Sequence, residues 1–433
     1  MQHWARTCVL ALLLGGTAVT AQRAPAAPHT TGISAERIER LHRGMQGFVD
    51  RREVGGIVSL LARHGKIVDL RAFGAKDVES RTPMRTDTLF RIASMSKPIT
   101  SVAVMMLFEE GRFALTDPVS RYLPAFRNVK VAVRTAPDAE PTLVPARRPV
   151  TIRDLLSHRS GLSYGFLDGG PVGDAYRKAG VTDGLELTTL SLAENVDRLA
   201  QAPLQSQPGA EWHYSLSVDV LGRLVEVVSG TTFDVFLRDR LFKPLKMNET
   251  SFDVPEDKWA RLATVYSPDG QGGIRPMKDP ETFGNTRMSP LASYRTGKTY
   301  FSGGAGLVST ATDYLRFAQM LLNEGELDGV RLLSPKTVQL MALSQTSDLP
   351  AAALLGPGAN FGLGFKVTTD LAASQTLGSE GMYGWSGIYG TTFWIDPKEQ
   401  LVAIMMMQGY PGPPVAGAFQ TLTYQAIVGS ARH

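Results

Sequence analysis

The chain contains the run Thr88-Leu-Phe-Arg-Ile-Ala-Ser94, followed directly by Met95-Ser-Lys-Pro-Ile-Thr-Ser-Val-Ala-Val-Met-Met-Leu-Phe-Glu-Glu110. The first part is typical of a strand, and the second predicts a strongly apolar helix that ends at Gly111. A helix that is apolar on every side between Val102 and Leu107 must be buried. We therefore expect this helix to lie inside the protein and to bury Lys97 in its first turn.

Both ends of the chain predict helices and strands that surround this run. On the N-terminal side, Ser34 caps a helix to about residue 50, and a hairpin follows with strands at 57–63 and 66–73 and a turn at His64-Gly65. On the C-terminal side, strands are expected at 361–367, 382–395 and 400–407, with a turn at Asp396-Pro397 and a last helix from about residue 415 to 428.

The middle of the chain has a different pattern, with short helical segments at 152–157, 190–200 and 218–228 between loops rich in Pro and Gly. Strands at both ends and helices between them favour one antiparallel sheet that both ends build together. The predicted fold class is α+β. The sheet lobe takes residues 34–116 and 300–433, and a mostly helical lobe of residues 117–299 is inserted. We expect the functional groups in the cleft between the lobes.

Composition and charge exclude several classes of protein. The 433 residues are 43% hydrophobic and 20% charged, which is typical of globular proteins and excludes a disordered or fibrous chain. The net charge is +4, but the basic residues are scattered, so we predict no nucleic-acid partner. The single cysteine, Cys8, excludes an intramolecular disulfide and a Cys-rich zinc site.

The first 21 residues are typical of a secretory signal peptide. Arg6 supplies the positive start, residues 8–14 the apolar core, and residues 19–21 a small-residue exit. Residues 22–33 follow as a flexible leader rich in Ala, Pro and Thr. We expect a soluble protein that is exported to the periplasm or secreted, with no stable membrane span after cleavage. An uncleaved N-terminal anchor is the alternative interpretation.

Ser94 and Lys97 form an S-x-x-K tetrad at the start of the apolar helix. Positions i and i+3 share one helix face, so Lys97 can approach the hydroxyl of Ser94. The positive end of the helix dipole also favours an oxyanion nearby. The alternative interpretation is a helix cap followed by an exposed lysine.

A second serine, Ser163, lies in Gly161-Leu-Ser-Tyr-Gly165, which matches the G-x-S-x-G nucleophile elbow. That elbow needs a strand before it and a helix after it, whereas here a helix precedes it and a loop follows. The histidines downstream are His213, which is close in sequence, and the terminal His433. We interpret Ser163 as a coincidental match, and we expect a structural role for His158.

A serine nucleophile needs a base to take its proton. The candidates for Ser94 are Lys97 and a tyrosine, and both side chains have pKa values near 10 in water. Either pKa must fall by about three units for the group to act at pH 7. Burial lowers the pKa of a lysine, and a nearby cation lowers that of a tyrosine. A Lys–Tyr pair can therefore lose one proton between its two members, and the loss belongs to the pair rather than to either residue.

Three motifs in this chain resemble, in order and spacing, those of serine β-lactamase-like hydrolases. They are Ser94-Met-Ser-Lys97, Trp212-His-Tyr214-Ser-Leu216 and Gly384-Trp-Ser-Gly387, with further typical stretches at 155–162 and 302–310. The resemblance covers residues 34–430 and is greatest to class C β-lactamases and family VIII carboxylesterases. It implies a β-lactamase/DD-peptidase-like fold, an antiparallel sheet flanked by helices with an inserted helical lobe.

The resemblance also implies catalytic roles. Ser94 is the acylated nucleophile, Lys97 its proton partner, and Tyr214 the general base and proton relay. The backbone N–H groups of Ser94 and of Ile388, which follows the third motif on an edge strand, form the oxyanion hole.

Another stretch, Arg295-Thr-Gly297, is nearer in letters to the K-T-G motif of penicillin-binding proteins. It precedes Ser302-Gly-Gly, whereas the family order places the third motif after that stretch. We interpret it as a coincidence.

Two departures from the β-lactamase pattern point to a different substrate. Leu216 stands where β-lactamases have the Asn that binds the acylamino group, and Trp385 stands where they have the Lys that meets the substrate carboxylate. Losing the amide and the cation removes recognition of a charged β-lactam, and Trp385 offers an apolar wall instead. The expected substrate-binding residues are Trp385, Ser386, Gly387 and Leu216. The alternative interpretation of Trp385 is a sheet residue packed on the core.

These inferences together predict an exported serine hydrolase. We expect a carboxylesterase that cleaves short neutral acyl esters through an acyl-enzyme on Ser94. The expected partner is a small-molecule ester or amide, no metal or cofactor is implied, and the sequence indicates no oligomeric state. The alternatives are β-lactamase or D-Ala-D-Ala peptidase activity, acyl transfer, amide hydrolysis, and a catalytically inactive homologue that binds cell-wall fragments or a protein.

Overall fold

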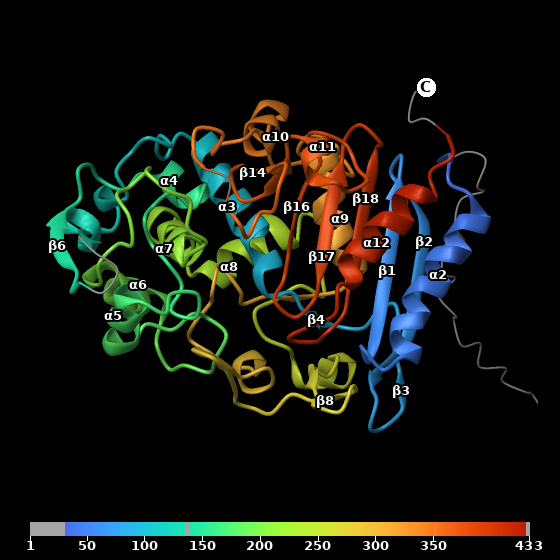
Figure 1. Ribbon diagram of the computed structural model, residues 1–433. Helices are drawn as coiled ribbons and strands as arrows, with labels where there is room; N and C mark the ends of the chain where they lie inside the picture. Colours follow the sequence, from blue (N-terminus) through green and yellow to red (C-terminus); the bar gives the residue numbers. More distant parts are fainter. Residues whose placement is uncertain (1–30, 135–138, 351, 430–433) are drawn as a thin grey trace, which may run out of the picture.

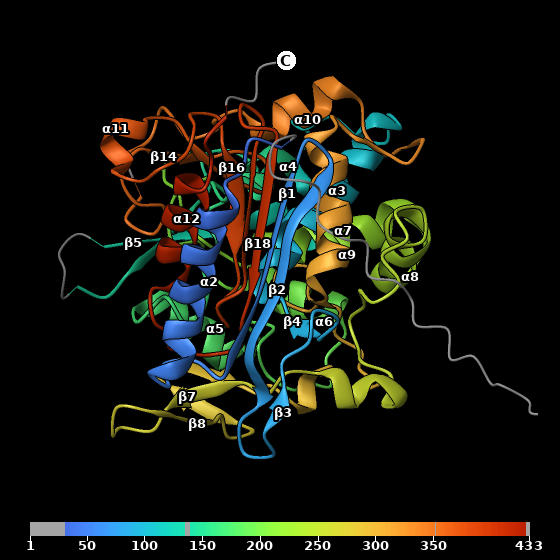
Figure 2. The same cartoon turned by 90° about the vertical axis from the view of Figure 1, so that its right-hand side faces the viewer.

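The computed structural model describes residues 31–134, 139–350 and 352–429. The predicted signal peptide and most of the predicted leader lie outside these residues. The structure confirms the α+β fold class: one antiparallel sheet of eight strands carries helices on both faces (Figures 1 and 2). No helix in the described part of the chain is long and apolar enough to cross a membrane.

Strands from both ends of the chain build the sheet, as the sequence predicts. The strand order is β14-β15-β16-β17-β18-β1-β2-β3. The C-terminal strand β18 (Leu401–Met406) pairs antiparallel with the N-terminal strand β1 (Gly56–Arg63). The other strands are β2 (Lys66–Asp77), β3 (Thr82–Pro83), β14 (Ala359–Phe361), β15 (Lys366–Thr368), β16 (Tyr383–Ser386) and β17 (Thr392–Asp396).

Two of the expected strands are each divided into a pair. The run 361–367 forms the end of β14 and the start of β15, because the chain turns at Gly364, where φ is +94°. The run 382–395 forms β16 and β17, with a turn between them at Gly387 and Gly390. A Cβ at Gly387 would lie 2.3 Å from the carbonyl oxygen of Ile92, so only glycine fits where β16 ends.

The two faces of the sheet have separate layers of helices (Figure 2). Helices α2 (Ala35–Asp50) and α12 (Val415–Gln425) cover one face, and α3 (Ser96–Glu109) and α9 (Ala311–Leu322) cover the other. The alternation of side chains along β17 decides which core each residue joins. Trp394 packs with α2 and α12, whereas Phe393 packs with α3 and α9.

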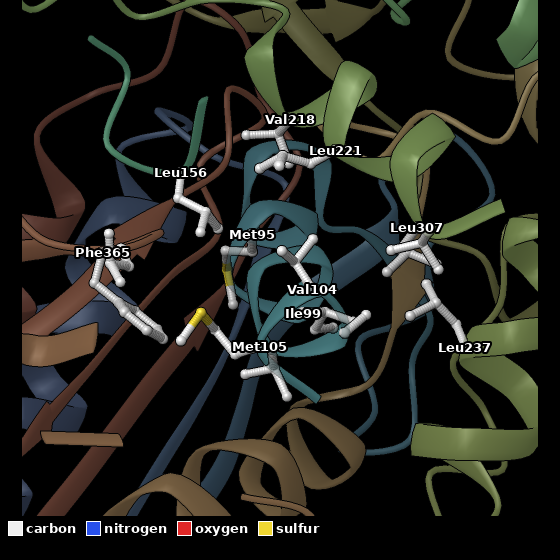
Figure 3. Close-up of a cluster of buried hydrophobic side chains, with 14 of the residues drawn as sticks. Met95, Ile99, Val104, Met105, Leu156, Val218, Leu221, Leu237, Leu307 and Phe365 are labelled. Carbon is white, nitrogen blue, oxygen red and sulfur yellow. The ribbon is translucent and has the colours of Figure 1, made fainter. Parts of the chain in front are cut away.

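Helix α3 is buried over most of its length, as its composition predicts. Every residue from Ser96 to Leu107 is buried, including Lys97. Figure 3 shows Ile99, Val104 and Met105 among side chains of α7 (Ser217–Ser229), α8 (Phe233–Leu237) and other segments. Each fully buried aliphatic side chain contributes about 1.5–3 kcal/mol of hydrophobic free energy. The core therefore holds the segment that carries Ser94 and Lys97.

The chain between the two parts of the sheet forms the expected helices and also short hairpins that the sequence pattern did not indicate (Figure 1). Its remaining helices are α4 (Ile152–Leu156), α5 (Pro171–Ala179) and α6 (Leu192–Gln201). Its hairpins pair β5 (Lys130–Val133) with β6 (Thr142–Pro145), β7 (Tyr266–Pro268) with β8 (Ile274–Pro276), and β9 (Glu281–Phe283) with β10 (Thr286–Met288). Further elements are β12 (Glu326–Leu327), β13 (Val330–Arg331), α10 (Pro335–Ala342) and α11 (Leu371–Ser374).

A separate two-stranded ladder leads the chain to Ser94. It pairs β4 (Phe90–Arg91) with β11 (Val308–Ser309). Arg91 is fully buried, and its guanidinium donates hydrogen bonds to the carbonyl oxygens of Pro290 and, at 2.7 Å, of Ala263. The backbone N–H of Arg91 donates to the side-chain oxygen of Gln408 at 3.1 Å. These bonds connect the segment before Ser94 to three loops that are distant in sequence.

Candidate active site

The chain enters the site through a strained turn just before Ser94. Ala93 has a φ of +42°, in the left-handed region that alanine rarely adopts. Ser94 follows in a 3₁₀ helix (Ala93–Met95) that continues into α3. The hydroxyl of Thr391 donates to the carbonyl of Ile92 at 3.3 Å, so the loop after β16 holds this turn in place.

Lys97 lies beside Ser94 and is only 1% exposed. Its Nζ is 3.1 Å from Ser94 Oγ and donates a hydrogen bond to the carbonyl oxygen of Gly304 at 2.8 Å. Burial lowers the pKa of Lys97 to about 7, although the carboxylate of Asp219 opposes this shift. A large share of the amine is therefore neutral near pH 7, and a neutral amine can accept the proton of a serine hydroxyl.

Tyr214 completes a group of three with Ser94 and Lys97. The Nζ of Lys97 lies 4.4 Å from the centroid of the Tyr214 ring. The phenol oxygen accepts a hydrogen bond from the indole N–H of Trp385 at 3.1 Å. Burial raises the pKa of Tyr214 far above its usual value, and hydrogen bonds with Ser94 and Trp385 only partly oppose this shift. The phenol therefore keeps its proton at pH 7, and Lys97 is the member of the pair that loses one.

Aromatic neighbours hold the ring of Tyr214 in place. The centroids of the Tyr164 and Trp385 rings each lie 5.3 Å from that of Tyr214, and the His158 ring lies at 5.0 Å. Burial lowers the pKa of His158 well below its usual value, so the imidazole is neutral. Its Nδ1 lies 3.0 Å from the hydroxyl of Ser215. His158 thus packs behind Tyr214, in the structural role that we expect from the sequence.

Sequence reasoning missed the polar groups beneath Lys97. Asp219, in the first turn of α7, is fully buried and accepts a hydrogen bond from the Tyr300 hydroxyl at 2.9 Å. Burial raises the pKa of Asp219, and hydrogen bonds and the charge of Lys97 oppose this shift. A Cβ at Gly304 would lie 2.6 Å from Asp219 Oδ2 and 2.8 Å from the Tyr164 hydroxyl, so the groups leave room only for glycine. The sequence signal that could have indicated Asp219 is an acidic side chain within a helix predicted to be apolar.

The two residues of the expected oxyanion hole line the same cavity. Ser94 lies in the first turn of a helix, where N–H groups have no acceptor within the helix. Ile388 lines the same cavity as Ser94, and its N–H forms no backbone hydrogen bond within the described residues. The expectation of an edge strand is wrong, because β16 lies between β15 and β17. Pairing with β15 ends at Gly384, however, so the strand is unpaired on that side from Trp385 onwards.

The structure brings Trp385 and Gly387 to the wall of this cavity but not Leu216. Trp385 is half-buried, with its indole against Tyr214. Ser386 points to the other face of the sheet, where its hydroxyl lies 2.8 Å from that of Thr392. Leu216 is fully buried at the start of α7 because its side chain is part of the hydrophobic core, which corrects its expected contact with substrate.

Ser163, His213 and Arg295 do not line this cavity, although Tyr164, next to Ser163, does. Ser163 is buried in the loop after α4 with no strand before it, so the context of a nucleophile elbow is absent. His213 lies 3.0 Å from a carboxylate oxygen of Glu211. Arg295 is exposed, with its guanidinium 5.4 Å from the centroid of the Trp259 ring.

Ser94, Tyr214 and Trp385 line a cavity of about 620 Å³, which is large enough for a drug-sized molecule. The other residues that line it are Tyr164, Phe166, Leu167, Asp183, Leu185, Ala305, Leu354, Leu355, Gly356, Pro357, Ala359, Lys366, Thr368, Ser374, Thr376, Met382, Tyr383, Gly384, Ser386, Gly387, Ile388, Thr392, Phe393, Trp394, Tyr410 and Gln420. Within this lining the charged side chains are Asp183 and Lys366. No cluster of His, Cys, Asp and Glu suited to hold a metal ion occurs in the described part of the chain.

Asp183 supports the cavity wall next to Tyr164. Its two carboxylate oxygens accept the backbone N–H groups of Gly165 and Phe166, at 2.8 and 3.0 Å. Burial raises the pKa of Asp183 to about 7, and these two hydrogen bonds oppose the shift. The carboxyl group therefore positions the loop that carries Phe166 and Leu167, which both line the cavity.

Known proteins resemble this chain in sequence and in structure. The model of the beta-lactamase family matches residues 41–424. Esterase EstB of Burkholderia gladioli is 37% identical over 380 residues, which cover 85% of this chain and 90% of the esterase. The solved structure of EstCE1, described as a hydrolase with promiscuous acyltransferase activity, has a TM-score of 0.78 at 32% identity and covers 91% of this chain and 98% of EstCE1. Simvastatin synthase from Aspergillus terreus has a TM-score of 0.75 at 25% identity, with 91% and 98% covered.

We predict that Gly304→Ala slows the reaction of Ser94 with a fluorophosphonate probe by about 10²-fold, the typical cost of misplacing a catalytic group by about 1 Å. The added Cβ pushes against Asp219 and Tyr164 and displaces the carbonyl that holds Lys97. The rate is measured by intact-mass spectrometry, and circular dichroism reports whether the variant is folded. Gly417→Ala on α12 is the control, because its Cβ meets no atom within 4 Å. A folded Gly304→Ala variant that reacts at the wild-type rate contradicts the role of this carbonyl.

Proposed function

The chain belongs to the beta-lactamase family of serine hydrolases, and we propose that it is a carboxylesterase that cleaves esters of short, uncharged acyl groups through an acyl-enzyme on Ser94. The observation that carries the proposal is the place of Trp385. Its indole donates to Tyr214 in the cavity wall, where the β-lactamase pattern has a lysine for the substrate carboxylate. An apolar wall in place of a cation favours a neutral substrate at this point.

Acylation begins when the ester carbonyl carbon comes within reach of Ser94 Oγ. The hydroxyl oxygen attacks the carbon while its proton passes to the neutral Nζ of Lys97, 3.1 Å away. Negative charge develops on the carbonyl oxygen, and the N–H groups of Ser94 and Ile388 stabilise it. Lys97 therefore acts as the base, because burial leaves its amine neutral and leaves the phenol of Tyr214 protonated.

The tetrahedral intermediate collapses when the bond between carbon and the alcohol oxygen breaks. The leaving oxygen takes a proton from the hydroxyl of Tyr214, which regains one from Lys97. Water then attacks the acyl-enzyme and loses its proton to the same pair, and Ser94 leaves with a proton. In the acyl-transfer alternative, an alcohol takes the place of this water.

The chemistry around Ser94 supports a neutral acyl group. Tyr164, Phe166 and Trp385 give this part of the cavity aromatic walls. Asp183, the acidic side chain in the lining, repels a substrate carboxylate when it is ionised. The relatives named as an esterase and as a hydrolase support the same class of reaction. The β-lactamase and D-Ala-D-Ala peptidase alternatives share the three catalytic groups but require recognition of an anionic substrate.

We predict that the enzyme hydrolyses p-nitrophenyl butyrate with a kcat/KM about 10²-fold or more above that for nitrocefin, since the nitrocefin carboxylate lacks a cation at Trp385. Steady-state kinetics with the two chromogenic substrates measure the ratio. Ser94→Ala abolishes both the activity and labelling by a fluorophosphonate, which peptide mapping locates. Ser163→Ala is the matched control and keeps both. A higher kcat/KM for nitrocefin overturns the esterase assignment, and an absence of labelling in the wild type supports an inactive binding homologue.

We predict that kcat/KM for p-nitrophenyl butyrate rises with pH through a midpoint near 7 and levels off about one unit above it. The sign follows from Lys97: its pKa is lowered, so the amine loses its proton and becomes a base as pH rises through about 7. Asp183 titrates in the same range and lines the same cavity. Asp183→Asn therefore serves as the control. A midpoint that persists in this variant supports Lys97, and one that disappears assigns the titration to Asp183.

We also propose that the protein is exported, because residues 1–21 have the charge and apolar pattern of a signal peptide. Expression of the full chain in a Gram-negative host is expected to yield periplasmic protein whose N-terminal residue is Gln22. N-terminal sequencing after cell fractionation tests this outcome. A variant that lacks residues 2–21 is the control and is expected to stay in the cytoplasm. A full-length chain that keeps Met1 in the cytoplasm contradicts export.

A further inference from the structure

The cavity that contains Ser94 continues to the opposite face of the sheet. Lys366 on β15 is directly opposite Gly384 on β16, and Gly384 is directly opposite Trp394 on β17. Directly opposite residues project from the same face of an antiparallel sheet. Lys366 and Trp394 thus share a face, and the Trp394 ring packs 5.3 Å from that of Phe419 on α12. Trp385, next to Gly384, projects from the other face, against Tyr214.

The part of the cavity on the α12 face has a different chemistry from the part around Ser94. We refer to it as the Lys366 compartment. Its polar lining includes Lys366, Thr368, Thr376, Ser386, Thr392 and Gln420. These six hydrogen-bonding side chains, next to Trp394, make this compartment polar. The part of the cavity with Ser94 is instead lined by aromatic rings. A molecule that reaches around the open edge of β16 meets both environments.

Lys366 provides the positive charge of this compartment. The side chain is half-buried, and within the described residues it forms no ion pair and no side-chain hydrogen bond. Burial lowers the pKa of Lys366, and no neighbouring carboxylate contributes to the shift. Removing an ammonium from water without a partner costs free energy. A bound anion can offset this cost, because it supplies the missing opposite charge in a place of reduced dielectric constant.

We propose that the Lys366 compartment binds the carboxylate of a substrate whose ester carbonyl lies at Ser94. One ammonium balances one negative charge, and the surrounding hydroxyls and the amide of Gln420 can donate to its oxygens. The inference rests on the proposed esterase function, which assigns the short neutral group to the acyl part. The carboxylate therefore lies at the far end of the alcohol part. The substrate class is an ester of a short acyl group with a hydroxy acid.

Butanoate esters of ω-hydroxy acids of increasing chain length test the proposal. Each ester is compared with the same ester ending in a primary amide, and butyrate release gives kcat/KM. The wild type is expected to prefer the carboxylate by about tenfold at the length that spans the two compartments, the size of one charge-assisted hydrogen bond. Lys366→Met removes this preference, whereas Lys366→Arg keeps it. Lys398→Met, at an exposed position in the β17–β18 turn, is the matched control.

A binding measurement separates failure of this inference from failure of the esterase function. The Ser94→Ala protein is titrated calorimetrically with the free ω-hydroxy acids, and binding is expected to weaken about tenfold in the Ser94→Ala, Lys366→Met double variant. If Lys366-dependent binding occurs but no ester is hydrolysed, the compartment is supported and the esterase function is overturned. If neutral esters are hydrolysed but neither the carboxylate preference nor the binding depends on Lys366, the compartment is overturned and the esterase function stands.

Discussion

The burial of the Lys97 amine is the physical constraint on which this site depends. An ammonium removed from water loses solvation, and burial lowers the pKa of Lys97 to about 7 even though the carboxylate of Asp219 opposes this shift. The carbonyl of Gly304 accepts one hydrogen bond from the amine, which holds it beside Ser94. This arrangement is possible only because α3 is apolar on every side and is packed within the core.

The same low-dielectric surroundings divide the roles of Lys97 and Tyr214. Burial favours the neutral form of any ionisable group, so it leaves more of the lysine as the free amine at pH 7 and makes the tyrosine a weaker acid. The pair therefore holds its proton on the phenol, where Trp385 donates a hydrogen bond to the oxygen. Trp385, which stands where the β-lactamase pattern has a lysine, thus contacts Tyr214 directly. In the proposed function, substrate selection and proton transfer therefore both depend on the place of this side chain.

Much of the fold and the proximity of Ser94, Lys97 and Tyr214 could be predicted from the sequence. The periodicity of the sequence predicted the strands β1 and β18, which pair with each other. The i,i+3 spacing predicted that Lys97 lies beside Ser94. The errors occur where neighbours distant in sequence decide the conformation. Gly387 ends β16 because the carbonyl of Ile92 approaches it, and no local pattern encodes that approach. Leu216 matches a motif position, but its side chain joined the core, which depends on the packing around α7. Asp219 was missed because an acidic residue in an apolar helix has no local partner.

The sequence by itself determined the class of fold, the buried helix and the spacing of Ser94, Lys97 and Tyr214, because helical and strand periods and short motifs act over a few residues. The tertiary structure decided the electrostatics. The pKa of Lys97 and the neutral state of Tyr214 depend on how completely water is excluded, and this exclusion comes from segments that are distant in sequence, such as the Gly304 turn, 207 residues from Lys97. Only the sheet register shows that Lys366 and Trp385 lie on opposite faces, because side-chain direction across a sheet follows from which strands pair.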